Sequence, residues 1–367
     1  MTTWVHEAGP QHVRFGTGTA SRLRPIVRDA GARRVMLVTS KGRLESELVD
    51  RAQRSIGRML ASTFDQAEPH VPAPVVQDAV RRVRSDDIDT IVTIGGGSVI
   101  DLGKAIGFFL EQEAGTPGTT IDDRPALVHV AVPTTFTRAE ATSYFGMTDP
   151  MGRQKHHATS PTALPRWVVL DPELGAEAPV ELAVTSALAA LAGAVEAALS
   201  SSRTPEADLL AHAAVGRLVG AVDRVASAPD DLDARVAMAE GALLSGRARQ
   251  NAGLGAHFGL TQLLGGRTAM RHGLAAAALL APVVRFDADA AGAQLAQLGA
   301  LLGAEDVASV LEDLVRGLPI PHTLAESGIE DDDLLAVARM APGHPAVQAN
   351  VRPTGEADAL ALLRTAT

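Results

Sequence analysis

Three consecutive glycines and a serine, Gly95 to Ser98, lie between an apolar β-like run at 88–97 and a helical pattern at 98–110. Glycine has no Cβ, so a phosphate group can approach the backbone closely at such a turn. The free N–H groups and the dipole at the start of a helix then favour an anion. A GGG turn is not the G-x-G-x-x-G fingerprint and can be purely structural, but its place between a strand and a helix favours a nucleotide phosphate.

A second polar loop, VPTTFTRAE at 132–140, follows the next strand-like run and contains Thr134, Thr135 and Arg138. Ligands of open α/β sheets bind outside the carboxyl ends of the strands, so two polar loops at neighbouring strand ends predict a nucleotide site. The threonine hydroxyls can hydrogen-bond the nucleotide. The Arg138 guanidinium either clamps a phosphate or carboxylate with two hydrogen bonds, or fills the pocket itself.

A third stretch, NAGLGAHFGLTQLLGG at 251–266, is typical of an apolar, glycine-spaced helix. Phe258 and Gln262 are four residues apart and therefore share one helix face. A metal site on this face would need imidazoles, whereas the sequence supplies a phenyl ring and an amide. His257 is adjacent, and its ring points either toward a ligand or into the core.

Composition excludes several classes of function. The 367-residue chain is long enough for two domains with sizeable cores. Its hydrophobic content of 46% and charged content of 21% are those of an ordinary globular protein. The formal net charge of −10 argues against nucleic-acid and anionic-membrane partners. The absence of cysteine excludes disulfides, thiolate metal ligands and cysteine nucleophiles.

The sequence carries no recognisable targeting signal. Its first ten residues, MTTWVHEAGP, lack the basic and apolar regions of a signal peptide. The most apolar stretches, such as LAAAALLAPVV at 274–284, are too short to span a bilayer. We therefore expect a cytoplasmic protein that makes no membrane contact and acts on a small molecule.

Strand-like and helix-like patterns alternate in the first half of the chain. Apolar runs that predict buried strands lie at 33–40, 88–97 and 126–135, and helical periodicity lies at 73–87 and 98–110. Alternation of this kind is typical of a Rossmann-like parallel sheet with crossover helices. From about residue 180 onward the chain is rich in alanine and leucine, with helical periodicity and short Gly/Pro/Asp breaks.

These patterns predict two domains. We expect an α/β dinucleotide-binding domain at 1–165 and an all-α substrate or catalytic domain at 166–367.

The motifs resemble a known family. TIGGGSVIDLGKAI at 93–106 and AVPTTFTRAEATSYFGMTD at 131–149 are similar to the iron-containing alcohol dehydrogenase superfamily, which has the dehydroquinate synthase-like fold. Within it, segments such as NVRPTGEADALALLR at 350–364 most resemble the maleylacetate reductases. The resemblance implies a nicotinamide-binding first domain, a helical second domain, an active site in the cleft between them, and a homodimer.

The same resemblance assigns the cofactor-binding positions. They are Ser40, Gly95, Gly96, Gly97, Ser98, Asp101, Lys104, Thr134, Thr135 and Arg138, the last of which stands where close relatives have glycine. Members that prefer NAD often carry an aspartate at the position of Ser40, where it binds the ribose 2′-hydroxyl. Without that carboxylate a 2′-phosphate is not repelled and can pair with Lys41 or Arg43, so we expect NADPH to be tolerated as well as NADH.

The metal ligands of the superfamily, an aspartate and three histidines, are mostly replaced. By resemblance their positions are occupied by Ala189, Gly193, Phe258 and His272. A further histidine of the family, near the nicotinamide, is replaced by Gln262. A catalytic zinc or iron site needs at least three protein donors, and alanine, glycine and phenylalanine supply none. The sequence therefore predicts that no metal binds.

Three functions remain open. The first is an NAD(P)H-dependent reductase of a small keto or unsaturated acid, similar to maleylacetate reductase but independent of metal. Its developing oxyanion would need hydrogen-bond donors or positive charge from His272, His257 or an arginine, with Gln262 nearby. The second is a non-redox lyase, isomerase or cyclase that reuses the site, and the third is a non-catalytic nucleotide-binding protein.

Overall fold

The structure, a computed structural model, describes residues 4–149, 154–268 and 270–367. They form two compact units, which we describe separately. The α/β unit comprises residues 7–178, and the helical unit joins the chain up to His6 to residues 179–367.

A parallel sheet of six strands forms the centre of the α/β unit. Its spatial order is β1-β8-β5-β4-β2-β3. The strands are β1 (His12–Phe15), β2 (Val35–Val38), β3 (Leu60–Phe64), β4 (Thr90–Gly95), β5 (Val128–Pro133) and β8 (Trp167–Leu170). The strands expected at 33–40, 88–97 and 126–135 correspond to β2, β4 and β5, which confirms the expected α/β fold class.

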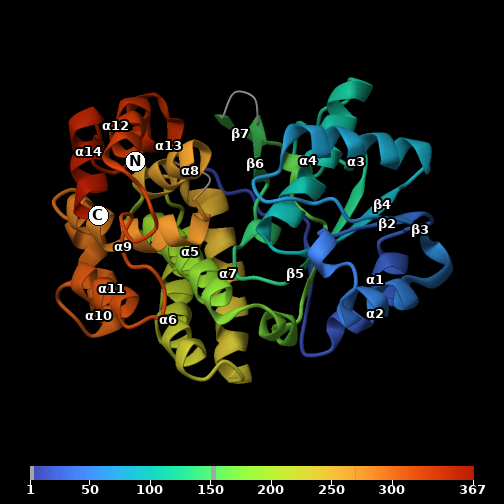
Figure 1. Cartoon of the computed structure of the whole chain (residues 1–367), viewed down its shortest axis with the longest axis horizontal. Coiled ribbons are helices and arrows are strands. Elements are labelled where there is room, and N and C mark those ends of the chain that lie inside the picture. The colour runs from blue at the N-terminus through green and yellow to red at the C-terminus, as the bar shows by residue number, and fades with distance from the viewer. Residues whose placement is uncertain (1–3, 150–153, 269) are drawn as a thin grey trace. The chain divides into compact units, whose positions relative to one another are not determined.

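Helices cover both faces of this sheet (Figure 1). They are α1 (Leu23–Asp29), α2 (Glu47–Ile56), α3 (Ala73–Ser85) and α4 (Gly97–Ala114). In β2, Val35 and Leu37 pack in one apolar cluster with α1 and α2, whereas Met36 and Val38 pack in another with α3 and α4. Because both faces are buried, the strand has a continuous apolar run instead of an alternating pattern.

The chain reverses direction across the sheet between β2 and β4. The helix after β2 covers one face and the helix after β4 covers the other. The Thr39 hydroxyl, just after β2, donates a 2.9 Å hydrogen bond to the Ile94 carbonyl in β4 and joins the two strand ends. Such a reversal opens a crevice at the carboxyl ends of the strands, where ligands of this kind of fold bind.

Sequence periodicity did not predict the antiparallel hairpin of β6 (Tyr144–Asp149) and β7 (Gln154–Thr159). Its strands contain several polar residues and lack a regular alternation of apolar side chains. The hairpin packs beside α4 through Phe145, which is buried in the same apolar cluster as Leu102 and Ile106.

The change of unit falls at residues 178 and 179, later than the expected boundary at 165 and 166. Strand β8 lies between these two points and pairs in parallel with β1 and β5, so it is part of the sheet. The composition of the sequence marks where the long helices begin, but it does not reveal which sheet the last strand joins.

The elements of the second unit are all helices among its described residues, as expected. Its helices are α5 (Val180–Leu199), α6 (Pro205–Ser227), α7 (Leu232–Ala252), α8 (Ala256–Thr268), α9 (His272–Asp287), α10 (Gly292–Leu302), α11 (Val307–Arg316), α12 (Asp331–Met340), α13 (Pro345–Gln348) and α14 (Glu356–Thr365). The His6 ring is within 2.8 Å of the Thr204 hydroxyl, which also caps α6, and so links the N-terminal residues to this unit.

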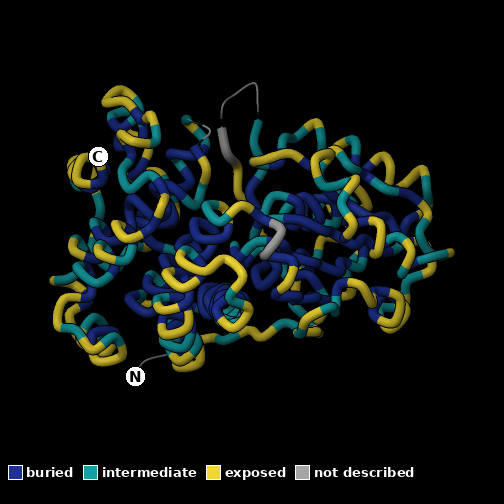
Figure 2. Tube along the Cα trace, turned by 60° about the horizontal axis from the view of Figure 1, so that its bottom comes forward, coloured by how far each residue is buried: buried dark blue, intermediate teal, exposed yellow. Residues whose placement is uncertain are grey.

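Helix α5 is the core of the helical unit. Among the described residues it is the one helix long and apolar enough to cross a membrane, but 89% of its most apolar window is buried in the structure. The expectation that every apolar stretch is too short for a membrane is therefore wrong for this helix. Figure 2 shows buried residues running through the interior of each unit, with exposed residues on the outer turns. The apolar face of α5 is thus used for packing.

Candidate active site

The glycine turn lies at the carboxyl end of β4 and begins α4. Gly96 caps the helix, which starts at Gly97. A Cβ on Gly96 would lie 3.2 Å from the Thr135 hydroxyl oxygen, and one on Gly97 would lie 2.7 Å from the Thr137 hydroxyl oxygen. Glycine is therefore required at position 97 for the loop after β5 to approach this closely. The two polar loops predicted from the sequence do lie together.

Two threonine hydroxyls beside this turn have no hydrogen-bond partner in the protein. The Oγ1 atoms of Thr135 and Thr137 are both buried and unpaired. A buried hydroxyl without a partner is costly, so such atoms usually mark a place that a ligand or water fills. Next to the first N–H groups of the 18-residue helix α4, they fit the phosphates of a dinucleotide. Thr137 belongs to the predicted loop, although the sequence reasoning did not single it out.

The backbone of Thr134 fixes the second loop to the first. Its N–H donates a 2.9 Å hydrogen bond to the Gly95 carbonyl. On the other side of β4, Ser40 follows β2 and is partly exposed, and the short helical turn Lys41–Arg43 begins directly after it. Ser40 and the glycine turn therefore lie on neighbouring strand ends, as a site for the ribose and the pyrophosphate requires.

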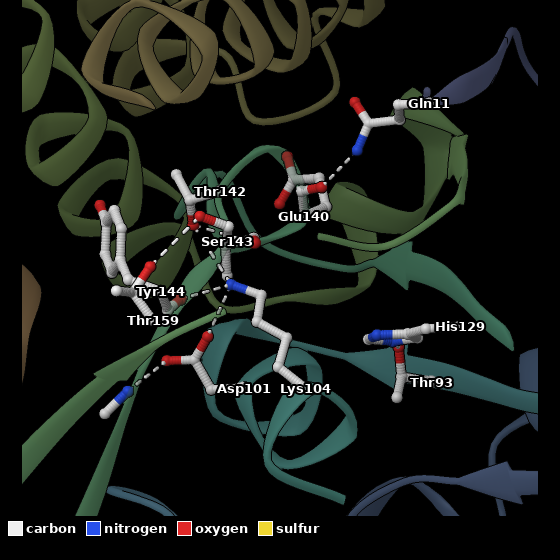
Figure 3. A network of polar contacts seen from close by, with 12 residues as sticks. Gln11, Thr93, Asp101, Lys104, His129, Glu140, Thr142, Ser143, Tyr144 and Thr159 are labelled. Atoms are coloured by element: carbon white, nitrogen blue, oxygen red, sulfur yellow. Dashed lines mark hydrogen bonds and ion pairs between the residues drawn. The ribbon is translucent and has the colours of Figure 1, made fainter. Parts of the chain in front are cut away.

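Asp101 and Lys104 hold α4 to the hairpin (Figure 3). The fully buried Lys104 ammonium lies 3.1 Å from Asp101 Oδ1, 3.2 Å from the Thr142 hydroxyl and 2.9 Å from the Tyr144 carbonyl. These three partners use its three donors. The resemblance assigned both residues to cofactor binding, whereas the structure places them in a network that positions β6 beside α4.

The loop after β5 also contains two unusual buried groups. Arg138 is buried and has a φ of 64°, in the left-handed region that favours glycine. Glu140 is 1% exposed, and its Oε2 has no hydrogen-bond partner. Burial raises the pKa of Glu140 to about 7, although the charges of Lys104 and Arg138 oppose this rise.

In the helical unit, Phe258 is the centre of a second constellation, which we call the Phe258 cluster: Arg249, Phe258, His272 and His344. The Phe258 ring is 6.4 Å from the His272 ring and 6.5 Å from the His344 ring, both edge-on. The guanidinium carbon of Arg249 is 4.5 Å from the centre of the Phe258 ring, a distance typical of a cation–π contact. The cluster thus combines a permanent cation with two imidazoles.

Glycines allow the histidines of the cluster to come this close. A Cβ on Gly273, next to His272, would lie 2.6 Å from the Thr185 carbonyl oxygen of α5. A Cβ on Gly259, next to Phe258, would lie 3.1 Å from the His344 ring nitrogen Nδ1. Substituting either glycine would push apart the helices that bring the cluster together.

The sequence did not predict a role for His344. Its Nδ1 accepts a 3.2 Å hydrogen bond from the Ala346 N–H, which leaves the proton of a neutral ring on Nε2. Burial lowers the pKa of His344, although the Glu196 carboxylate opposes this effect. His344 and Phe258 are far apart in the sequence, and no local pattern links them.

The other two catalytic candidates, Gln262 and His257, are both buried and differ in their contacts. Gln262 is 8% exposed, and its buried Oε1 has no hydrogen-bond partner in the structure. The His257 ring is buried, and its Nε2 is 2.9 Å from the Ala276 carbonyl of α9, so it joins α8 to α9. Only His272 of the two predicted catalytic histidines lies against the Phe258 ring in this way.

Glu196 of α5 contacts two members of the Phe258 cluster. Its Oε1 accepts a 3.1 Å hydrogen bond from the Phe258 N–H, and its Oε2 lies 3.8 Å from Nη2 of Arg249. Both side chains are almost fully buried, with exposed fractions of 9% for Glu196 and 1% for Arg249.

The chain matches one family along nearly its whole length. Residues 10–172 match the model of the iron-containing alcohol dehydrogenases, and residues 183–367 match the C-terminal model of the Fe-containing alcohol dehydrogenase family. The chain belongs to the iron-containing alcohol dehydrogenase family. It is therefore an NAD(P)-dependent oxidoreductase, as the sequence predicted.

Several relatives in this family are maleylacetate reductases. Maleylacetate reductase 1 of Cupriavidus pinatubonensis is 34% identical over 327 residues, which are 89% of this chain and 87% of that protein. The maleylacetate reductase of Rhizobium sp. (strain MTP-10005) is 32% identical over 348 residues, 94% of this chain and 93% of that protein.

Solved structures agree with this assignment. The crystal structure of the Rhizobium maleylacetate reductase has a TM-score of 0.87 and 30% identity, and the match covers 100% of this chain and 98% of that chain. A 1,3-propanediol oxidoreductase has a TM-score of 0.93 and 29% identity, and the match covers all of both chains.

Proposed function

We propose that this enzyme is an NAD(P)H-dependent reductase of a small keto or unsaturated carboxylic acid, of the maleylacetate reductase type, and that it works without the metal of its family. The relatives named above support the reaction type. The observation that carries the second half of the proposal is the set of side chains at the family's metal-ligand positions.

These side chains do not fit a divalent metal. Ala189 and Gly193 are buried on α5, and Phe258 is buried on α8, so three of the four positions have no donor atom. Within the described parts of the chain, no group of three or more histidine, aspartate or glutamate side chains is arranged to hold a metal ion. Because a catalytic zinc or iron site needs at least three protein donors, we route no step of the reaction through a metal.

The dinucleotide, in contrast, fits the residues of the α/β unit. The glycine turn begins α4, whose first N–H groups favour a phosphate, and the buried, unpaired hydroxyls of Thr135 and Thr137 beside it can donate to phosphate oxygens. When bound, the cofactor supplies a hydride to an electrophilic carbon of the substrate.

The protein must then stabilise negative charge and supply a proton. Hydride addition to a carbonyl leaves an alkoxide, and addition to a conjugated alkene leaves an enolate. In either case one proton completes a two-electron reduction and leaves NAD(P)⁺. His272, which lies beside Phe258, is our candidate for donating that proton to the substrate.

This role predicts that His272→Ala lowers turnover by about a hundredfold, a typical loss for one donor or general acid. The measurement is the initial rate of NADH and NADPH oxidation with maleylacetate as the probe substrate. The matched control is His212→Ala on α6, whose ring is within 2.9 Å of the Asp208 carbonyl of its own helix; it should keep wild-type turnover. Unchanged turnover in His272→Ala would remove His272 from the mechanism.

The proposal also includes a cytoplasmic homodimer, as expected from the resemblance to the family. Light scattering of the purified protein should give twice the 38.0 kDa mass of the chain. A mass equal to that of one chain would contradict the dimer and leave the reductase assignment intact.

A further inference from the structure

Helix α7 contains two buried arginines with different surroundings. Arg235 lies near the start of the helix and donates from its Nε to the Pro229 carbonyl at 2.6 Å. Arg249 lies in the last turn, stacked on the Phe258 ring, with its side chain 1% exposed. A guanidinium remains charged in proteins, so Arg249 places a permanent positive charge inside the helical unit.

The surroundings of Arg249 include the side of α5 from which the metal ligands are missing. Ala189, Gly193 and Glu196 are spaced by four and three residues, so they share one face of α5. The Glu196 carboxylate on this face lies 3.8 Å from Arg249. The guanidinium of Arg249 lies over the ring of Phe258, which occupies a third ligand position. Alanine, glycine and phenylalanine thus stand at three of the family's ligand positions, and Arg249 lies beside the phenylalanine.

We propose that the Arg249 guanidinium is the cation that binds the carboxylate of the substrate, in the part of the fold where other members of the family hold a metal. The proposal rests on the proposed function and deepens it, because it assigns the substrate class: oxo acids with a carboxylate, and not neutral aldehydes or alcohols. Arg249 is then a specificity-determining residue of this chain.

The chemistry of the group suits this task. A guanidinium is planar and matches a carboxylate with two parallel hydrogen bonds, which a spherical cation does not. The 3.8 Å separation from Glu196 is longer than a hydrogen bond, so Glu196 balances the charge of Arg249 without forming a hydrogen-bonded fork with it. The cation–π contact with Phe258 helps to hold the Arg249 side chain in place before binding, which lowers the entropy lost on binding.

A separate observation also points to a ligand at this cluster. Gln262 is one helical turn after Phe258 on the same face of α8, and its buried Oε1 has no hydrogen-bond partner in the structure. An amide oxygen accepts a hydrogen bond from a donor. A hydroxyl or amide N–H of a bound ligand would therefore satisfy Gln262.

The alternative is that Arg249 only fills the space left by smaller side chains. Binding of succinate tests this, because succinate carries carboxylates but cannot accept a hydride. Isothermal titration calorimetry of the full-length protein, with and without NADP⁺, should detect succinate and should not detect succinamide, its uncharged analogue. If succinate does not bind, or if succinamide binds as tightly, the proposal is overturned.

The variants decide which residue is responsible. Arg249→Met keeps an apolar side chain against Phe258 and should weaken succinate binding at least tenfold, while Arg249→Lys keeps the charge and should lose less. Removing one partner of a buried ion pair can prevent folding, so the double variant Arg249→Met with Glu196→Gln removes both charges. The matched control, Arg235→Met, removes a buried arginine from the same helix and should bind succinate like the wild type. A folded double variant with wild-type affinity would overturn the proposal.

Activity separates this inference from the proposed function. If Arg249 governs succinate binding but the wild type reduces no oxo acid, the proposed reductase fails and the carboxylate site stands. If the wild type reduces maleylacetate and Arg249→Met has an unchanged KM, the carboxylate site fails and the reductase stands. When both hold, KM for maleylacetate should rise at least tenfold in Arg249→Met.

Discussion

Arg138 and Glu140 are both held in unfavourable states, Arg138 by its backbone conformation and Glu140 by the burial of its carboxyl group. The φ of 64° at Arg138 lies in a region where residues other than glycine are strained, typically by about 1–2 kcal/mol. Glu140, two residues later, is buried beyond the reach of water. Strain and buried charge of this kind concentrate at functional sites, and both residues belong to the loop that faces the glycine turn.

The raised pKa of Glu140 predicts how stability depends on pH. A carboxyl whose pKa rises from 4.5 to about 7 on folding binds more protons in the native state, so the free energy of unfolding falls as the pH rises from 4.5 to 7. Glu140→Gln removes this loss. Relative to wild type, the variant should gain up to about 3 kcal/mol between pH 5 and pH 8, measured by urea unfolding. A difference that is the same at both pH values would show that Glu140 is charged in the fold.

Ser40 predicts the choice of cofactor. It lies at the end of β2, next to the glycine turn, where a carboxylate would repel a 2′-phosphate. Ser40→Asp should weaken NADPH binding at least tenfold and leave NADH binding within about threefold, as measured by fluorescence titration. Equal losses for the two cofactors would place the 2′-position of the ribose away from Ser40.

The turn between β4 and α4 is the element whose substitution should affect cofactor binding most directly. Gly96→Val would place side-chain atoms against Thr135, since a Cβ alone comes within 3.2 Å of its hydroxyl. We expect this variant to lose NADH and NADPH binding with an almost unchanged circular dichroism spectrum. Gly107→Val, in the same helix, is the matched control, because a Cβ there meets nothing within 4 Å. If Gly96→Val binds both dinucleotides normally, the turn is only structural.

The sequence predicted those elements whose signals are local. Apolar runs located β2, β4 and β5, and helical periodicity located α3 and α4, because each pattern reflects burial of its own segment. The glycine turn and its neighbouring loop were found for the same reason. The β6–β7 hairpin was missed because its strands lack a regular alternation of apolar side chains, and its hydrogen bond with Lys104 is made by the Tyr144 backbone carbonyl, which any residue would supply.

The Phe258 cluster was only half predictable. Phe258 and His272 stand at positions that the family resemblance marks, so their identities could be compared with expected ligands. His344 and Glu196 join the cluster through contacts between distant helices, which a single sequence does not encode locally. The sequence left the direction of the His257 ring open for a related reason, because its bond to the Ala276 carbonyl depends on where α9 packs.

In the proposed function, the molecule combines a dinucleotide site in the α/β unit with a set of side chains in the helical unit that does not hold a metal. A dinucleotide site needs a turn whose backbone can be approached closely and hydroxyls without a hydrogen-bond partner, and the α/β unit has both. The Phe258 cluster of the helical unit has a guanidinium, an aromatic ring and two imidazoles.

This combination predicts that activity is insensitive to chelators. Elemental analysis of the purified protein should find no stoichiometric zinc or iron, and EDTA should leave the rate of NADPH oxidation unchanged. Phe258→His alone should not create a metal site, because with His272 it supplies two donors where at least three are needed, and the positive charge of Arg249 stays nearby. One tightly held transition metal per wild-type chain, removed by chelator together with activity, would mean that donors other than those at the family positions hold it.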